Sequence, residues 1–383
     1  MNRIESFINR LFPILRPVPA GVYHRQETPE GEAPYRLHLR VEPDGSGVLI
    51  INASTVLHLN QTAAEYAYYM IQGKADAEAV QEVSRRYHVS QEQAQADFSS
   101  LKERLLTLAG EEDVDPVTYL NFDRLEPYSP KISAPYRLDC ALTYRTPEAG
   151  DAPTDRVRRE LLTAEWQQIL DKAWNAGIPH VIFTGGEPTT RADLSEIIAY
   201  AEKLGMVAGL LTDGSRLSDS EYLQKLLNSG LDHIMLLLDP VEDQAWEALR
   251  DMLAADVHVT VHLTVTPANE VVMLTALDML AQLGVQALSL STTSSAHEDM
   301  LAGIRQRAAE RNLTLVWDLP VPYSRFNPVE FELHEGKPVQ EGAGKAWLYV
   351  EPDGDVLPRQ GVNRVLGNLL SDPWEKIWAA RKE

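Results

Sequence analysis

Two histidines, His258 and His262, lie four residues apart in an apolar run that is typical of a β-strand. Side chains alternate between the two faces of a strand, so both imidazoles are expected on one face together with Thr260 and Thr264. Imidazole nitrogens bind zinc and related metals, and Asp239 is a candidate third ligand. The alternative is that these polar side chains line a solvated cavity. Because the sequence alone cannot place Asp239 or another ligand beside them, we predict no metal site.

A Gly-Gly-Glu-Pro turn, made of Gly185, Gly186, Glu187 and Pro188, follows a strand-like run at residues 180–184. Glycine lets a backbone come close to a ligand. The Glu187 carboxylate can either meet that ligand or stabilise the turn, and the sequence leaves both interpretations open.

Cysteine chemistry is limited, because Cys140 is the one cysteine of the chain. A single thiol can form no intrachain disulfide and no cysteine-based metal cluster. We expect Cys140 to be a small buried residue at the end of a strand.

The elements that position these residues alternate between strand and helix patterns from Leu138 onward. Repeated strand–helix units joined by right-handed crossovers give a parallel sheet. We therefore predict an α/β fold with an open, partial (β/α)6 barrel, similar to part of a TIM barrel, over residues 136–325. The strand-like runs after Leu138 are 180–184, 207–212, 233–238, 257–265, 287–291 and 313–317.

The N-terminal part is organised differently, because three strand-like runs are followed by three helical patterns. This order predicts a small winged-helix-like unit over residues 22–110. Residues 21–33, rich in Pro, Glu and Gly, are expected to be a spacer, and residues 111–135 a linker. The strand-like runs are 35–41, 47–51 and 55–59, and the helical patterns are 61–72, 75–87 and 90–108.

Composition narrows the range of partners. Acidic residues outnumber basic ones, 56 against 35, and the net charge of -21 opposes binding to nucleic acid. No stretch reaches the roughly 20 apolar residues of a membrane span, so we predict no span and a cytoplasmic location. Residues 1–20 form an amphipathic helix by pattern. It is expected to dock on the protein itself, with attachment to a membrane surface as the alternative.

Residues 22–110 resemble the PqqD-like domains that recognise ribosomally made, later modified peptides. In that family the leader of a precursor peptide adds as an extra strand beside the third strand and packs against the last helix, a form of β-augmentation. The alternative is a winged helix that packs only within the protein. Carried over to this chain, the binding edge is Ser54, Thr55, Val56, Leu57, His58 and Leu59, and the helical wall includes Phe98, Leu101 and Leu105.

Residues 136–325 resemble the barrel of radical S-adenosylmethionine (radical SAM) enzymes. That family holds an iron–sulfur cluster with a CxxxCxxC loop after the first strand. Here Cys140 keeps the first position, while Tyr144 and Pro147 stand at the second and third. The Gly-Gly-Glu-Pro turn is similar to the family's motif for the methionine end of the nucleotide. The implied nucleotide or ligand cleft comprises Gly185, Gly186, Glu187, Pro188, Thr212, Asp213, Asp239, His258 and His262.

Residues 326–383 resemble the twitch or SPASM extension, which carries auxiliary clusters in its relatives. Glu341 and Arg359 stand where cysteines are typical, whereas the frame around Tyr349 and Gly367 is kept. Every position that would need a thiolate, save Cys140, therefore lacks one.

Together these resemblances predict a pseudoenzyme of ribosomal peptide modification. It would bind a precursor or leader peptide and serve as a scaffold or as the partner of a modification enzyme. We expect no cofactor and no iron–sulfur cluster; binding of S-adenosylmethionine in the cleft is the alternative. The alternative is an enzyme that uses a retained ligand or metal in the barrel cleft for non-radical chemistry.

Overall fold

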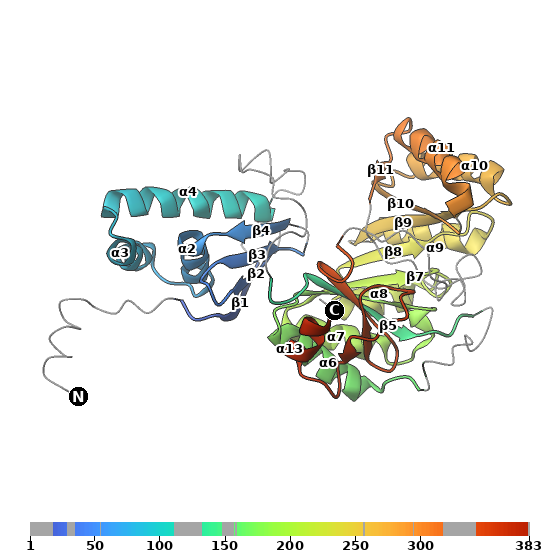
Figure 1. The fold of residues 1–383 in the computed structure, drawn as a ribbon. Helices are drawn as coiled ribbons and strands as arrows, with labels where there is room; N and C mark the ends of the chain where they lie inside the picture. Colours follow the sequence, from blue (N-terminus) through green and yellow to red (C-terminus); the bar gives the residue numbers. More distant parts are fainter. Residues whose placement is uncertain are drawn as a thin grey trace, which may run out of the picture. The chain divides into compact units, whose positions relative to one another are not determined.

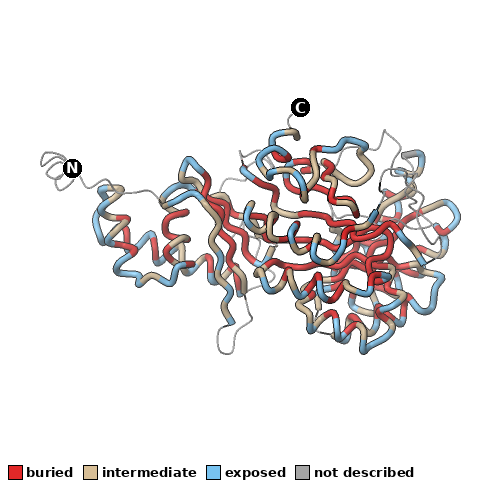
Figure 2. The backbone as a smooth tube through the Cα atoms, turned by 90° about the horizontal axis from the view of Figure 1, so that it is seen from below, coloured by how far each residue is buried: buried red, intermediate tan, exposed pale blue. Residues whose placement is uncertain are grey.

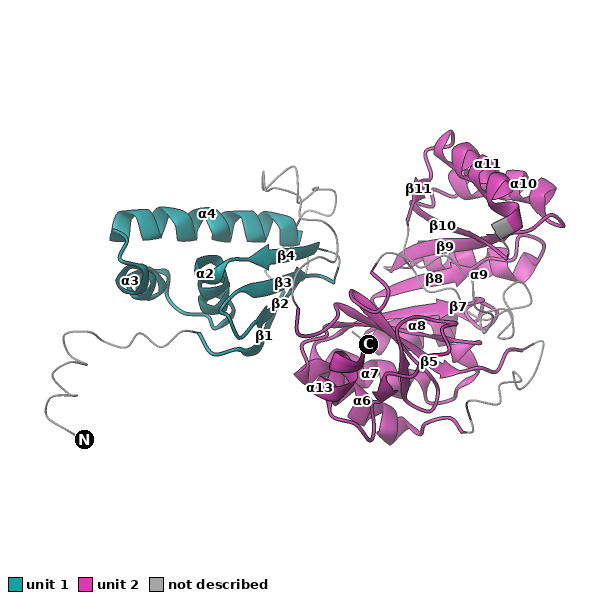
Figure 3. Cartoon of the chain, viewed as in Figure 1, with its two compact units in different colours: residues 1–125 teal, residues 126–383 magenta. Residues whose placement is uncertain are grey.

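The computed structural model describes residues 18–28, 35–53, 55–110, 132–147, 157, 159–255, 257–293, 295–316 and 342–381. The chain forms two compact units, Met1–Leu125 (unit 1) and Glu126–Glu383 (unit 2), shown in Figure 3. The amphipathic helix predicted for residues 1–20 lies almost wholly outside the described residues, as do most of the predicted linker and residues 326–341.

Unit 1 contains a four-stranded antiparallel sheet in the order β1-β2-β3-β4. The three predicted strands are confirmed as β2 (Tyr35–Val41), β3 (Gly47–Ile51) and β4 (Thr55–Leu59). The spacer prediction was wrong for β1 (Gly21–Glu27), which pairs with β2 along its whole length. The Tyr23 ring on β1 packs edge-on against Tyr68, with ring centroids 4.7 Å apart. An antiparallel partner and this packing hold a segment whose composition suggests a loop.

Three helices follow the sheet of unit 1, as predicted: α2 (Gln61–Ile71), α3 (Asp76–Tyr87) and α4 (Gln91–Gly110). Asn60 caps α2, since its side-chain oxygen accepts a hydrogen bond of 2.9 Å from the Ala63 amide. One apolar cluster joins the two sides of the unit, with Leu39 and Leu57 from the sheet and Leu105 from α4. Burial in each unit is concentrated on the strands (Figure 2).

Unit 2 contains a parallel sheet that stays open, so the predicted α/β class with a partial barrel is confirmed (Figure 1). Helices alternate with its strands. The strands are β5 (Arg137–Thr143), β6 (His180–Gly185), β7 (Val207–Thr212), β8 (His233–Leu237), β9 (His258–Val265), β10 (Ala287–Thr292) and β11 (Thr314–Leu315). The helices are α6 (Thr163–Asn175), α7 (Leu194–Leu204), α8 (Ser220–Asn228), α9 (Asp243–Ala254), α10 (Glu270–Gln282) and α11 (Glu298–Ala309), with short 3₁₀ turns η1 (Pro188–Thr190) and η2 (Ser295–His297).

The C-terminal segment continues the same sheet beyond β5. β12 (Trp347–Val350) pairs parallel with β5, and the antiparallel strands β13 (Asp355–Leu357) and β14 (Gly367–Asn368) follow it. The helix α13 (Trp374–Ala380) closes the segment. Its Trp378 donates an indole hydrogen bond of 3.0 Å to the Ile132 carbonyl. The C-terminal segment is therefore built into the barrel's sheet at the strand that begins it.

The two faces of the sheet are distinguished by side-chain alternation. Leu236 lies near Gly214, and so do Ala248 and Met252 of α9. Leu236 therefore lies on the face that the helices cover. The opposite, inner face carries the cluster of Ile182, Leu211 and Met235. None of the helices within the described ranges is both long and apolar enough to cross a bilayer.

Candidate functional site

The Gly-Gly-Glu-Pro turn at the carboxyl end of β6 lies against the segment that follows β5. The Gly186 amide donates to the Thr143 carbonyl and the Glu187 amide to the Arg145 carbonyl, each at 2.7 Å. A Cβ atom at Gly185 would lie 2.0 Å from the Thr143 oxygen, and one at Gly186 would lie 2.2 Å from the Arg145 oxygen. The two glycines are thus required by the close approach of two segments of this chain.

Glu187 is the polar centre of this turn. Its Oε1 accepts hydrogen bonds from the Thr189 amide (2.9 Å), the Thr189 hydroxyl (2.5 Å) and the Thr212 hydroxyl (2.8 Å). Its Oε2 accepts one of 2.7 Å from the Asp213 amide. Burial, followed by the charge of Asp213, raises the pKa of Glu187 to about 8. The Glu187 carboxyl group therefore joins the ends of β6 and β7, which is the turn-stabilising role that the sequence left open.

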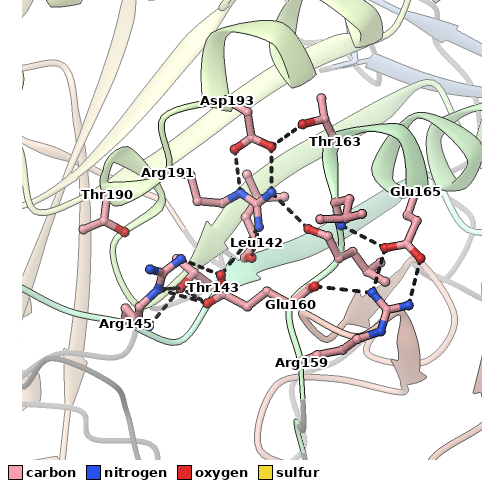
Figure 4. Close-up of polar contacts among 12 residues, drawn as sticks. Leu142, Thr143, Arg145, Arg159, Glu160, Thr163, Glu165, Thr190, Arg191 and Asp193 are labelled. Atoms are coloured by element: carbon pink, nitrogen blue, oxygen red, sulfur yellow. Dashed lines mark hydrogen bonds and ion pairs between the residues drawn. The ribbon is translucent and has the colours of Figure 1, made fainter.

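A second polar network holds the segment after β5, as Figure 4 shows. Arg191 donates to the Leu142 carbonyl at 3.1 Å and the Leu161 carbonyl at 3.0 Å, and its guanidinium is bidentate with Asp193 at 2.9 and 2.7 Å. Asp193 also accepts a hydrogen bond of 2.6 Å from the Thr163 hydroxyl. This arginine thus ties β5, the entry to α6 and the entry to α7 together.

The same figure shows a partly exposed pair beside this arginine. Arg145 and Glu160 form an ion pair of 2.6 Å, and the Thr143 hydroxyl donates to Glu160. Sequence reasoning missed Arg191 and Glu160. Their role depends on loops that only the fold brings together, so the sequence carried no signal for it.

The three side chains predicted to stand at cluster-ligand positions differ in placement. Cys140 is fully buried within β5, and burial raises the pKa of its thiol. Tyr144 is buried and its phenol donates a hydrogen bond of 3.0 Å to Glu351, whereas Pro147 is exposed. A thiol packed inside a strand, a bonded phenol and a proline ring do not fit the three-thiolate set of such a cluster.

The candidate metal ligands do not come together. His258 is the first residue of β9 and exposed, whereas His262 lies in the same strand four residues later and is 1% exposed. At about 3.3 Å per residue, the strand separates them by roughly 13 Å. This spacing does not support one ion bound by both histidines. Of the predicted cleft residues, Glu187, Thr212 and Asp213 lie together, whereas His258 lies at the other end of its strand.

His262 instead has hydroxyl partners on β10. Its Nδ1 lies 2.9 Å from the Ser289 hydroxyl and its Nε2 lies 3.0 Å from the Ser291 hydroxyl. Burial lowers the pKa of His262 to about 4, so the ring is neutral at neutral pH. Asp239 accepts a hydrogen bond of 3.2 Å from the Val241 amide in its own turn. His262 is thus held by its neighbours on β10, and Asp239 is held within its own turn.

The predicted peptide-binding residues lie on β4 and α4 of unit 1, except Ser54, which lies outside the described residues. Among the described strands β4 is at the edge of its sheet. Its Leu57 and Leu59 are buried, whereas Thr55, Val56 and His58 are partly exposed. Burial, followed by the charge of Arg40, lowers the pKa of His58.

On the helical wall the predicted residues fall into two groups. Phe98 and Leu105 are each 1% exposed and belong to the apolar cores of the unit. Leu101 is partly exposed and packs against both cores. Leu101 is therefore the member of the predicted wall that offers accessible surface, and the binding role stays a prediction.

Unit 2 is an open parallel barrel with a glycine-rich turn after its second strand, and its sequence matches proteins with the same features. Residues 140–253 match the profile of the Radical SAM superfamily. The chain is 29% identical over 289 residues to PqqA peptide cyclase of Streptomyces rochei, covering 66% of this chain and 78% of the relative. It is 26% identical over 292 residues to PqqA peptide cyclase of Methylobacterium nodulans, covering 66% and 74%.

Solved structures with a similar fold include SuiB of Streptococcus suis. Its crystal structure matches with a TM-score of 0.59 at 16% identity, over 89% of this chain and 86% of SuiB. SuiB bound to its precursor peptide SuiA matches with a TM-score of 0.59 at 14% identity, over 92% and 88%. At this identity the likeness shows the fold. The sequence relatives are peptide cyclases, so the chain is similar in sequence to peptide-modifying proteins over about two thirds of its length.

These matches contradict the prediction that the chain takes no cofactor and no iron–sulfur cluster. The barrel matches a superfamily whose members bind such a cluster and S-adenosylmethionine, and SuiB, which has the same fold, has been solved bound to S-adenosylmethionine. The prediction was wrong: it was drawn from the missing thiolates at positions where the resembled family has cysteines, and these matches overturn it.

Proposed function

We propose that the chain binds a precursor peptide through unit 1 and acts as a scaffold or partner in ribosomal peptide modification, rather than as the radical enzyme itself. Residues 22–110 would be a PqqD-like recognition domain, residues 136–325 a radical SAM-like barrel and residues 326–383 a SPASM-like extension. The cytoplasm, where ribosomal precursors are made, is the proposed location.

The observation that carries the peptide-binding proposal is the edge position of β4. A strand at the edge of a sheet presents backbone N–H and C=O groups that an added strand can pair with. Thr55, Val56 and His58 are partly exposed along this strand, and Leu57 shares an apolar cluster with Leu105 of α4. An extended peptide would therefore pair with β4 and meet the side of α4.

The scaffold proposal is supported by what surrounds Tyr144. A cysteine position of the family is filled by a buried phenol that bonds to Glu351, and the neighbouring Arg145 is paired with Glu160. These partners give the segment a structural role. The alternative of non-radical chemistry is not favoured, because His258 and His262 lie apart and the Glu187 carboxylate accepts four hydrogen bonds from the chain.

The test of peptide binding uses fluorescein-labelled SuiA together with an array of synthetic peptides from short reading frames near the gene. Val56→Pro and Leu57→Pro each remove one β4 amide, and one of these amides points away from β3. The control is Gln26→Pro on β1, the other edge of the same sheet. We expect the β4 variant whose proline replaces the outward-pointing amide to keep its circular dichroism spectrum and to lose peptide binding. The control should keep peptide binding. Equal binding by all folded variants would contradict this site.

The scaffold part has its own test. The chain, reconstituted anaerobically with iron and sulfide, is incubated with S-adenosylmethionine, dithionite and the peptide found above. We expect no 5′-deoxyadenosine above the level of a protein-free control. Formation of 5′-deoxyadenosine at a rate that depends on the chain would overturn the scaffold role and leave peptide binding intact.

A further inference from the structure

Two histidines at the amino-terminal end of the barrel's sheet contact each other across an intervening strand. His180 begins β6 and His233 begins β8, and β7 lies between them. Their Nε2 atoms are 2.8 Å apart and their ring centroids 5.0 Å apart. At this distance the N–H of one neutral imidazole donates to the bare nitrogen of the other.

Gly209 on β7 leaves the space that this contact needs. The strand register places Gly209 beside His233. A Cβ atom at Gly209 would lie 2.2 Å from Cε1 and 2.5 Å from Nε2 of the His233 ring. The imidazole therefore occupies the position of the missing side chain and reaches β6, so that β6 and β8 are joined directly by side chains.

The groups around the pair disfavour positive charge on it. The charges of Arg137 on β5 and His258 on β9 both lower the pKa of His233, and the charge of Arg137 also lowers the pKa of His180. Two nearby carboxylates have partners of their own. Asp139 pairs with Arg137 at 2.7 Å, and Asp232 accepts a hydrogen bond of 2.8 Å from the Ala208 amide.

These surroundings shift the pKa of both rings in the same direction. Burial, then His258 and Arg137, lower the pKa of His233 to about 4. Burial, then His233 and Arg137, lower the pKa of His180 well below its ordinary value. Both imidazoles are therefore neutral at neutral pH, which is the state in which one N–H can be shared between them.

We propose that His180 and His233 form an acid-sensitive joint, which holds β6 and β8 together while the rings are neutral and opens when both are protonated. With a hydrogen on each facing nitrogen, the N–H···N bond is lost and two cations face each other beside Arg137. In the unfolded chain a histidine titrates near about pH 6.5. Because the unfolded state binds more protons below that value, the stabilisation is complete above about pH 6.5 and is lost as the pH falls toward 4.

The test is urea unfolding of the full chain at about pH 7.5 and about pH 5, followed by tryptophan fluorescence. All seven tryptophans belong to unit 2, so the signal reports the unit that holds the joint. Between these two pH values, one histidine with the stated pKa values changes the unfolding equilibrium by roughly 30-fold. We expect the change in the unfolding equilibrium between these two pH values to differ by about this factor between His233→Leu and the wild type, with the variant less destabilised by acid. The control, His297→Gln in the same unit, should keep the wild-type response.

A wild-type acid response in folded His233→Leu would overturn the joint. A measurement on the unaltered protein covers the case in which that variant does not fold. In ¹⁵N-histidine-labelled protein, the two rings linked by a shared N–H···N hydrogen should stay neutral at about pH 5.5. Titration of both rings near about pH 6.5, with no shared hydrogen, would equally contradict the proposal.

Discussion

The phenol of Tyr144 donates a hydrogen bond of 3.0 Å to Oε1 of Glu351, across 207 residues of sequence. Tyr144 is 4% exposed and Glu351 is 1% exposed. Tyr144 follows β5 and Glu351 follows β12, and these two strands pair in parallel. Tyr144 also packs with Tyr349 and Leu357 in one apolar cluster. The bond therefore joins the first strand of the barrel to the C-terminal segment, at the residue that the sequence analysis predicts to replace a cluster cysteine.

Replacing this phenol tests its structural role. Tyr144→Phe keeps the ring in its cluster but removes the donor to Glu351, so a buried carboxylate oxygen loses a hydrogen bond. We expect the free energy of unfolding of unit 2 to fall by about 1–3 kcal/mol, measured by urea unfolding with tryptophan fluorescence. Tyr200→Phe, which removes a phenol from the partly exposed Asp171 pair, should cost less. Equal effects would contradict a special role for Tyr144.

The Gly-Gly turn should not tolerate a side chain. Gly186→Ala would place a Cβ atom 2.2 Å from the Arg145 oxygen, so the backbone must move and the Glu187 amide loses its partner. We expect a loss of stability of about 3 kcal/mol or more. Gly303→Ala is the matched control, because Gly303 lies within α11 with open space around it. It should stabilise unit 2 by about 0.5–1 kcal/mol. Similar melting temperatures for the two variants would contradict this explanation.

Arg191 should not be replaceable by lysine. The guanidinium bonds two carbonyls and a carboxylate at once, and an ammonium cannot reach all of them in the same geometry. We expect Arg191→Lys to lower the stability of unit 2 by about 1–3 kcal/mol. Arg159→Lys is the control, because Arg159 pairs with Glu165 in an exposed setting and should change the urea midpoint little. A stable Arg191→Lys protein would show that the network is dispensable.

Sequence patterns predicted the elements well where periodicity is strong. The runs of β2, β3 and β4 and the barrel strands from β6 to β10 fall where alternation or apolar runs place them. β1 was missed because proline and glycine nearby suggest a spacer, while its pairing with β2 is a tertiary effect. The pairing of β12 with β5 could not be foreseen either, since parallel neighbours far apart in sequence leave no local signal.

The site was predictable in its residue types more than in its contacts. The turn at Glu187 was recognised, but the sequence could not show that Thr143 and Arg145 supply the carbonyls against which Gly185 and Gly186 pack. Grouping His258 with His262 followed the correct face of β9. It ignored the distance along the strand, which places the two at different depths of the sheet.

The charge of Glu187 should make the stability of unit 2 depend on pH. Its pKa in the folded chain is raised to about 8 from an ordinary value of 4.5, so between these values the folded state binds the extra proton. The stabilisation that comes with that proton is present below about pH 4.5 and is lost as the pH rises toward 8. The hydrogen bonds from Thr189 and from the Asp213 amide favour the charged form and already limit this rise in pKa.

Compared with Glu187→Gln, the wild-type protein should therefore lose about 1–3 kcal/mol of unfolding free energy between about pH 5 and about pH 7.5. The exposed Glu196→Gln serves as the control and should follow the wild type. The histidines contribute to the pH dependence with the opposite sign. Because they are present in both proteins, their contribution cancels in the difference between the wild type and Glu187→Gln. A difference that stays constant over this range would mean that the Glu187 carboxyl group is charged throughout and that its four donors outweigh both its burial and the charge of Asp213.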